Sequence, residues 1–230
     1  IHFAKFRVLK GLIIIKQKPK KIFLIGGVYL SPLIAIAEKY NIEVIEIQHG
    51  VINKYHLAFH FPDQKRNTYF PHKLLLFSDY WKSKATYPQG TELISTGNDF
   101  FFYDFDQHKE NKTILIIGNG LLYNHFLSFL KLNIDFFKKN GYKITYKLHP
   151  IEIPGWETRY KELKELNDSE RIKVITDQCS MAILIKKSEF VIGVNSTSIY
   201  ESLDSGCKVI ILDLQSSEYF DDLINSNIVK

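Results

Sequence analysis

The sequence predicts an α/β fold of two lobes, each built on a parallel sheet. Short runs rich in Val, Ile, Leu and Phe alternate with stretches of helical period, which is the pattern of βαβ units. After residue 97 an aromatic-rich segment leads into a polar stretch, 108–112, before a fresh strand begins. A composition shift of this kind indicates a crossing between two lobes.

The strands and helices are expected in regular alternation along the chain. Strands are predicted at 21–25, 44–48, 73–77, 93–95, 113–117, 143–148, 173–175, 190–194 and 208–212. Helices are predicted at 31–40, 80–87, 122–140, 156–166, 180–187, 198–204 and 217–225. We place the division between the lobes near Glu110, so that residues 1–110 form an acceptor-side lobe and residues 111–230 a donor-side lobe. Because the chain starts at Ile1 with neither Met nor a signal-peptide pattern, we expect the first lobe to be truncated.

Bulk composition narrows the class of protein. With 45% hydrophobic residues in 230, the chain can build a packed core, and its apolar runs, such as 12–15, are far too short to span a membrane. Cys179 and Cys207 have neither metal-ligand spacing nor the density of a disulfide scaffold, which favours the cytoplasm. The net charge of +5 forms no concentrated stripe, which argues against nucleic acid as a partner. An anionic substrate suits this charge, and so does peripheral contact with the anionic inner membrane.

The first candidate site follows the strand at 44–48. The glycine of Gln48-His49-Gly50 permits a sharp turn that would direct the His49 ring into a crevice, where it can act as a general base or steady a developing negative charge. The alternative is a histidine bonded to the loop backbone. The loop at 51–72 is long for its place, which is typical of functional or mobile segments, and His60 is its catalytic candidate. A solvated surface loop is the alternative there.

The second candidate site closes the strand at 143–148. In Lys147-Leu148-His149-Pro150 the proline restricts the preceding residue to extended backbone, so His149 would be held in a defined direction. A histidine so placed can donate a hydrogen bond to a phosphate oxygen, and Lys147 would add positive charge. A purely structural His-Pro turn is the alternative.

The third candidate site joins a strand to a helix at Asn195-Ser196-Thr197-Ser198. Hydroxyl side chains and unpaired amides at a helix start form an anion site, which makes Ser196 and Thr197 candidates for phosphate contact and Ser198 the candidate helix cap. Glu201 completes a capping-box spacing with Ser198, or alternatively accepts hydrogen bonds from a ribose.

A weaker signal lies at Gly118-Asn119-Gly120, after the strand at 113–117. The two glycines would allow close approach to a phosphate group, although the motif is neither a dinucleotide fingerprint nor a nucleotide-hydrolase loop. No Asp-x-Asp pair stands at a strand end, so we expect no obligatory metal and no cofactor.

Together, 46–50, 147–150 and 195–203 resemble bacterial surface-polysaccharide glycosyltransferases of the GT-B type, which have two Rossmann-like lobes. The resemblance is closest to capsule-synthesis enzymes and to sialyl-, polysialyl- and Kdo-transferases that use CMP-sugars. It implies that His149, Pro150, Ser196 and Thr197 bind the nucleotide and phosphate of the sugar donor. The acidic-acidic-glycine motif that carries the base in the sialyltransferase relatives is missing here, and Gln48-His49-Gly50 occupies the equivalent loop or the base lies outside this sequence.

The expected function is sugar transfer from a nucleotide-activated donor, CMP-sugar in preference to UDP-sugar, to a bacterial glycan or glycolipid acceptor. The donor is expected in a cleft between the lobes. Two alternatives stay open: a transferase of the CDP-glycerol type, and a scaffold without catalysis in a polysaccharide assembly complex.

Overall fold

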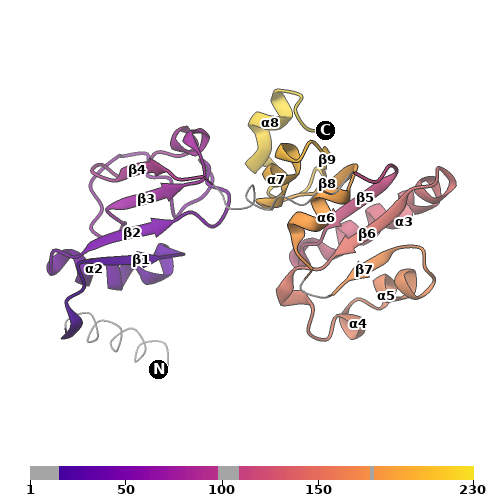
Figure 1. The fold of residues 1–230 in the computed structure, drawn as a ribbon, viewed down its shortest axis with the longest axis horizontal. Helices are drawn as coiled ribbons and strands as arrows, with labels where there is room; N and C mark the ends of the chain where they lie inside the picture. The colour runs from indigo at the N-terminus through magenta and orange to yellow at the C-terminus, as the bar shows by residue number, and fades with distance from the viewer. Residues whose placement is uncertain (1–15, 98–108, 177–178) are drawn as a thin grey trace. The chain divides into compact units, whose positions relative to one another are not determined.

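A computed structural model of the chain describes residues 16–97, 109–176 and 179–230. The chain divides into two compact units, Ile1–Asp99 and Phe100–Lys230, here called unit 1 and unit 2, and each is built on one sheet (Figure 1). The predicted α/β class with two parallel sheets is confirmed. The aromatic-rich segment at the expected crossing lies outside the described residues.

Unit 1 contains a four-stranded parallel sheet in which the strands follow one another in chain order, β1-β2-β3-β4. Helix α2 packs against this sheet, and Ile34 and Ala37 of the helix meet Leu24 and Val44 of the strands in a buried core. The strands are β1 (Lys21–Leu24), β2 (Glu43–Ile47), β3 (Lys73–Leu76) and β4 (Glu92–Ser95). The helices are the 3₁₀ helices η1 (Gly27–Leu30) and η2 (Asp79–Ser83) and the α-helix α2 (Ser31–Lys39).

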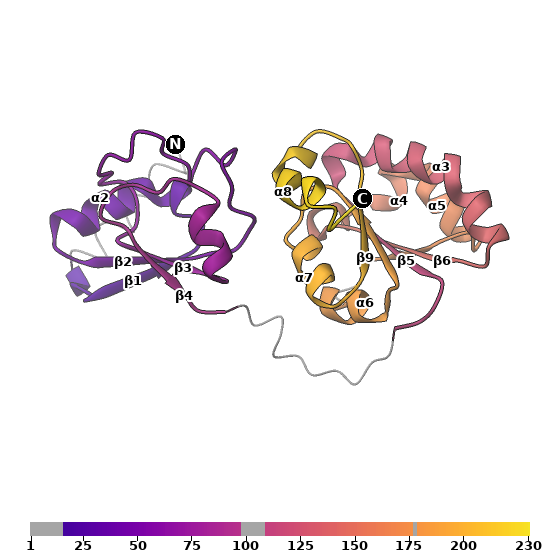
Figure 2. The ribbon, with the colours of Figure 1, turned by 90° about the horizontal axis from the view of Figure 1, so that it is seen from above.

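Unit 2 contains a five-stranded parallel sheet in the order β7-β6-β5-β8-β9. Helices cover both faces of this sheet, with α3 and α5 on one side and α6 and α7 on the other (Figure 2). The strands are β5 (Thr113–Ile117), β6 (Lys143–Lys147), β7 (Lys173–Ile175), β8 (Phe190–Gly193) and β9 (Lys208–Ile211). The α-helices are α3 (Tyr123–Lys139), α4 (Trp156–Arg159), α5 (Lys161–Asp168), α6 (Met181–Lys187), α7 (Ser198–Asp204) and α8 (Asp221–Asn225), and the 3₁₀ helices are η4 (Gly120–Leu122), η5 (Pro150–Glu152) and η6 (Ser217–Phe220).

The strand order of unit 2 determines where its loops meet. The chain starts at the central strand β5, builds outward through β6 and β7, and then returns to the other side of β5 with β8 and β9. Ligands of open parallel sheets bind outside the carboxyl ends of the strands at such a reversal. The loops after β6, β5 and β8 therefore lie side by side at the position where this fold places ligands.

The helix predicted at 80–87 is wrong, because only the short 3₁₀ helix η2 forms there. The amide of Thr86 donates to the Nδ1 atom of His60 at 3.1 Å, and the Tyr87 hydroxyl donates to the carbonyl of Trp81 at 2.7 Å. These contacts use backbone groups that an α-helix would need for its own hydrogen bonds. Contacts with a distant loop thus replace the helix.

The long helix predicted at 156–166 is interrupted at Tyr160, which has φ −115° and ψ 55° and separates α4 from α5. Its hydroxyl donates to the side chain of Glu152 at 2.9 Å, an attachment described below. The helix predicted at 217–225 likewise begins as the 3₁₀ helix η6 before α8. Among the helices of the described ranges, none has the length and apolar character needed to cross a bilayer.

Candidate functional site

Three strand-end loops of unit 2 line one groove of about 1380 Å³. They are the loop after β5, the turn after β6 and the segment between β8 and α7. The walls are completed by side chains from the α4–α5 connection and from the start of α6. The residues that line it are 117–121, 147–154, Arg159, Tyr160, Thr176, Cys179, Met181 and 194–198.

The turn after β6 holds His149 by a reciprocal pair of hydrogen bonds. His149 is exposed and extended, with φ −65° and ψ 143°, as expected of a residue before proline. Its Nδ1 atom accepts from the amide of Ile151 at 3.3 Å, and its own amide donates to Oε2 of Glu152 at 2.9 Å. Because Nδ1 accepts a hydrogen bond, the proton of the neutral ring belongs on Nε2, which is then a donor. The ring is oriented by the backbone and keeps that donor available.

The buried side chain of Glu152 anchors this turn through hydrogen bonds, and the sequence analysis did not identify this residue. The residue is only 3% exposed, and its Oε1 atom accepts from the Tyr160 hydroxyl at 2.9 Å. Burial and then this bond raise the pKa of Tyr160 to about 12, so the hydroxyl remains a donor at neutral pH. The ring of Tyr160 stacks on Tyr123 with centroids 4.0 Å apart. A capping-box spacing, His149 followed three residues later by Glu152, was the signal in the sequence that could have revealed this contact.

Arg159 also stabilises this turn. Its guanidinium donates to the carbonyls of Glu152 and Pro154 at 2.6 and 2.7 Å. Lys147, only 6% exposed, ends β6 and also lines the groove. Among the described lining residues, two cationic side chains, Lys147 and Arg159, stand against one carboxylate, that of Glu152. The balance of charge favours an anionic ligand.

Protein packing leaves little room for a side chain at either glycine after β5. A Cβ atom on Gly118 would lie 2.8 Å from the carbonyl oxygen of Lys147 and from the ring of Tyr146, and one on Gly120 would lie 3.1 Å from Oε1 of Glu152. The close approach for which glycine was expected is thus made by the neighbouring turn of the chain. A contact of Gly118 or Gly120 with a ligand stays a prediction.

The turn before α7 corrects the predicted cap. Ser198 is the first residue of the helix and is buried, while the Ser196 hydroxyl accepts from the Ser198 amide at 3.2 Å. The turn closes through backbone bonds such as Ile199 N–H to the Ser196 carbonyl at 3.1 Å. Thr197 takes the N-cap position and makes no side-chain capping hydrogen bond, so the cap lies one residue before the predicted Ser198. The capping box between Ser198 and Glu201 is accordingly wrong.

The third strand-end segment still brings its expected phosphate candidates into the groove. Asn195, Ser196, Thr197 and Ser198 all line it, opposite the turn that carries His149 and Pro150. Glu201 is half-buried in the first turn of α7 and, as far as the described residues show, stands outside the groove wall. Which of these residues contact a ligand stays a prediction.

The two catalytic candidates lie in unit 1. His49 is exposed after β2, and its turn is fixed by buried Gln48, which accepts from the Phe77 amide and donates to the Gly50 carbonyl, both at 2.9 Å. His60 is half-buried and its Nδ1 atom joins two loops through the Thr86 amide. Catalytic roles for both histidines stay predictions.

No family model matches the sequence. A curated protein of Methanocaldococcus jannaschii, itself uncharacterised, is 28% identical over 190 residues, which cover 78% of this chain and 33% of that protein. The chain thus spans about a third of the length of the curated relative it matches.

Solved structures show the same fold over nearly the whole chain. The S. aureus MnaA–UDP structure has a TM-score of 0.66 at 16% identity, and the matched region covers 99% of this chain and 65% of the MnaA chain. The UDP-GlcNAc 2-epimerase from Neisseria meningitidis has a TM-score of 0.59 at 17% identity, with coverages of 99% and 67%. MurG from Acinetobacter baumannii has a TM-score of 0.55 at 12% identity, with coverages of 97% and 62%.

The fold is GT-B-like. Likeness at these identities establishes the fold alone, and the GT-B-like chain spans about two thirds of each of these structures. Across the described residues of this GT-B-like protein, no three His, Cys, Asp or Glu side chains gather as metal ligands would.

Proposed function

We propose that this chain binds a nucleotide-activated sugar in the groove of unit 2 and acts as a glycosyltransferase toward a bacterial surface glycan. The observation that carries the proposal is the meeting of three strand-end loops, 118–120, 147–150 and 195–198, in one groove. All three were expected to approach phosphate on chemical grounds, the glycine loop most weakly. Their juxtaposition at the strand-order reversal supports a common ligand.

The groove offers complementary parts for such a donor. The Nε2–H donor of His149, the ammonium group of Lys147 and the hydroxyls of Ser196 and Thr197 suit the phosphate oxygens. Leu121 and Ile151 are 95% and 79% exposed at the groove and provide apolar surface for a base or sugar ring. The proposal assigns donor binding to unit 2 and the acceptor side to unit 1, and it requires no metal ion.

The names of the structural neighbours bear on the choice of nucleotide. MnaA of S. aureus and Alr3699/HepE of Anabaena are both described in complex with UDP. UDP therefore joins CMP, which the resemblance favours, as a donor nucleotide to test first.

A second candidate is rearrangement of a UDP-sugar within the same groove. It is favoured by neighbours described as UDP-GlcNAc 2-epimerases, including those from Neisseria meningitidis and Methanocaldococcus jannaschii. Proton NMR of UDP-GlcNAc incubated with the protein distinguishes the two. An epimerase changes the sugar signals without an acceptor, whereas a transferase releases UDP only when an acceptor is supplied. A new phosphodiester from CDP-glycerol would instead indicate the polyol-phosphate alternative.

The binding experiment is a calorimetric titration of UDP, CMP and CDP, with and without EDTA. The variant is His149→Asn, because asparagine keeps an acceptor for the Ile151 amide while it removes the ring. Loss of a hydrogen bond to a charged phosphate should weaken binding about tenfold or more. His125→Asn, on the exposed face of α3 outside the groove lining, is the matched control. Binding by none of the nucleotides, or unchanged affinity in His149→Asn, refutes the proposal.

A further inference from the structure

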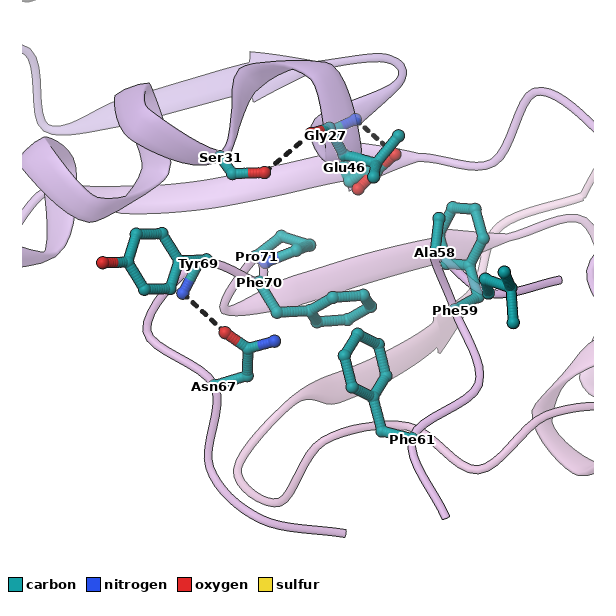
Figure 3. A pocket seen from close by; sticks show the side chains of 12 residues that line it. Gly27, Ser31, Glu46, Ala58, Phe59, Phe61, Asn67, Tyr69, Phe70 and Pro71 are labelled. Atoms are coloured by element: carbon teal, nitrogen blue, oxygen red, sulfur yellow. Dashed lines mark hydrogen bonds between the residues drawn. The ribbon is translucent and has the colours of Figure 1, made fainter. Parts of the chain in front are cut away.

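Unit 1 contains a separate cavity of about 240 Å³, lined by η1, the start of α2, one residue of β2 and the loop at 57–71 (Figure 3). None of the residues discussed for the nucleotide groove belongs to it. The cavity lies entirely within unit 1, so its description does not depend on the proposed function.

The wall formed by β2 carries a buried carboxylate. Glu46 is only 1% exposed, and its Oε1 atom accepts from the amide of Gly27 at 2.9 Å. Gly27 is required here, because a Cβ atom would lie 2.4 Å from Oε2 of Glu46. Burial raises the pKa of Glu46, and the amides of Gly27 and Gly26 partly oppose that effect. A strand position packed beside a core would ordinarily be apolar, since burying a carboxylate costs free energy.

Another part of the wall is aromatic and holds a hydrogen-bond donor. Phe61 and Phe70 meet edge to face with centroids 5.3 Å apart, and Phe59 packs on Phe70 at 6.1 Å. Asn67 accepts from the Tyr69 amide through Oδ1 at 2.9 Å. Its amide nitrogen points away from Tyr69, toward the side where Phe61 and Phe70 lie (Figure 3). The cavity thus combines an acceptor, a donor and aromatic rings.

We propose that this cavity binds one ring of a neutral, polyhydroxylated ligand, a sugar, with Glu46 accepting from its hydroxyls and Asn67 donating to them. A carboxylate has about four acceptor positions, so the two backbone amides leave capacity for a ligand. A hydroxyl both donates and accepts, which suits a wall with one group of each kind. An ammonium ligand would bring only donors and would leave the Asn67 nitrogen without an acceptor.

Size and exposure agree with a single ring. The volume is below the range of about 300–1,000 Å³ that is usual for drug-sized ligands. Leu57 is 90% exposed and Tyr69 is 58% exposed, so large apolar side chains stand at the opening of the cavity. The aromatic rings supply flat apolar surface for the carbon-bound hydrogens of a sugar.

The test is saturation-transfer-difference NMR on the whole chain, with N-acetyl-d-glucosamine, d-glucose and d-galactose as probes and ethylammonium as the cationic comparison. In Glu46→Gln the backbone amides keep the remaining acceptor oxygen, so the group offered to the ligand becomes a donor. We expect the best sugar to bind about tenfold more weakly to this variant. Asn67→Ala, which leaves the buried wall intact, should also weaken it.

The controls locate the site. Asp63→Asn makes the same carboxylate-to-amide change on an exposed position of the same loop and should leave sugar affinity unchanged. His125→Asn, on the exposed face of α3 and outside both the cavity and the groove, should also leave it unchanged. The proposal is overturned if no sugar gives a signal, if ethylammonium binds in preference, or if both folded cavity variants bind like the parent. Nucleotide calorimetry reports separately on unit 2, so either proposal can fail alone.

Discussion

Replacing Tyr160 with Phe removes one hydrogen bond beneath the groove and little else. The hydroxyl lies 2.9 Å from Oε1 of Glu152, which is 3% exposed, while the ring that stacks on Tyr123 is kept. A hydrogen bond to a charged group contributes about 1.5–3 kcal/mol. Because Tyr160 is itself half-buried, we expect the lower part of that range, about 1.5–2 kcal/mol, for the loss in free energy of unfolding of unit 2.

The two tryptophans of the chain make this loss measurable in one unit. Trp156 lies in unit 2 and is 8% exposed, and Trp81 lies in unit 1. In a Trp81→Phe background, urea unfolding followed by fluorescence therefore reports on unit 2. With a slope of about 2 kcal/mol per molar urea, Tyr160→Phe should lower the midpoint by about 0.7–1 M.

The control is Tyr142→Phe, which removes a hydroxyl at the amino ends of the strands of the same sheet, just before β6. A midpoint shift for Tyr160→Phe no larger than that of the control refutes the reasoning. Alkaline pH gives a second readout. The pKa of Tyr160 is raised from 10 to about 12, so its stabilisation is fully present below pH 10 and is lost as pH rises through about 12. The parent should lose stability in that window relative to the variant.

Two further predictions concern a glycine and a buried acid. Gly118→Ala should destabilise unit 2 by about 1–3 kcal/mol, since its methyl group would meet a backbone carbonyl at 2.8 Å, whereas Gly50→Ala, with open space around it, should change unfolding by less than about 0.5 kcal/mol. If both substitutions shift the urea midpoint of their own unit equally relative to the parent protein, the packing argument is contradicted. The raised pKa of Glu46 adds stability that is fully present below its unfolded value near 4.5 and lost as pH rises through the folded value. The stability of Glu46→Gln relative to the parent should therefore increase between pH 4 and pH 7 in Trp81-monitored unfolding, and a flat difference would speak against burial of the charge.

Local chemistry in the sequence determined the succession of elements. All nine predicted strands form in the described residues, with ends that differ by one residue at most, because short β-rich runs bounded by polar or glycine residues have few other ways to bury their apolar faces. The same reasoning predicted that His149 would be extended before Pro150. The helix interruptions were missed at Tyr160 and after Ser83, since each depends on a hydrogen bond to another part of the chain.

Tertiary structure alone decided which loops meet. Nothing local in β5 or β8 predicts that Ile114 pairs with Phe190. That pairing, together with the pairing of β5 and β6, brings the Ser196 turn into the same groove as the His149 turn. The burial of Glu152 and Glu46 also depends on distant segments, because a carboxylate loses its contact with water only when other parts of the chain pack over it. Pattern and propensity act over a few residues, whereas strand order and burial arise from contacts between segments far apart in the chain.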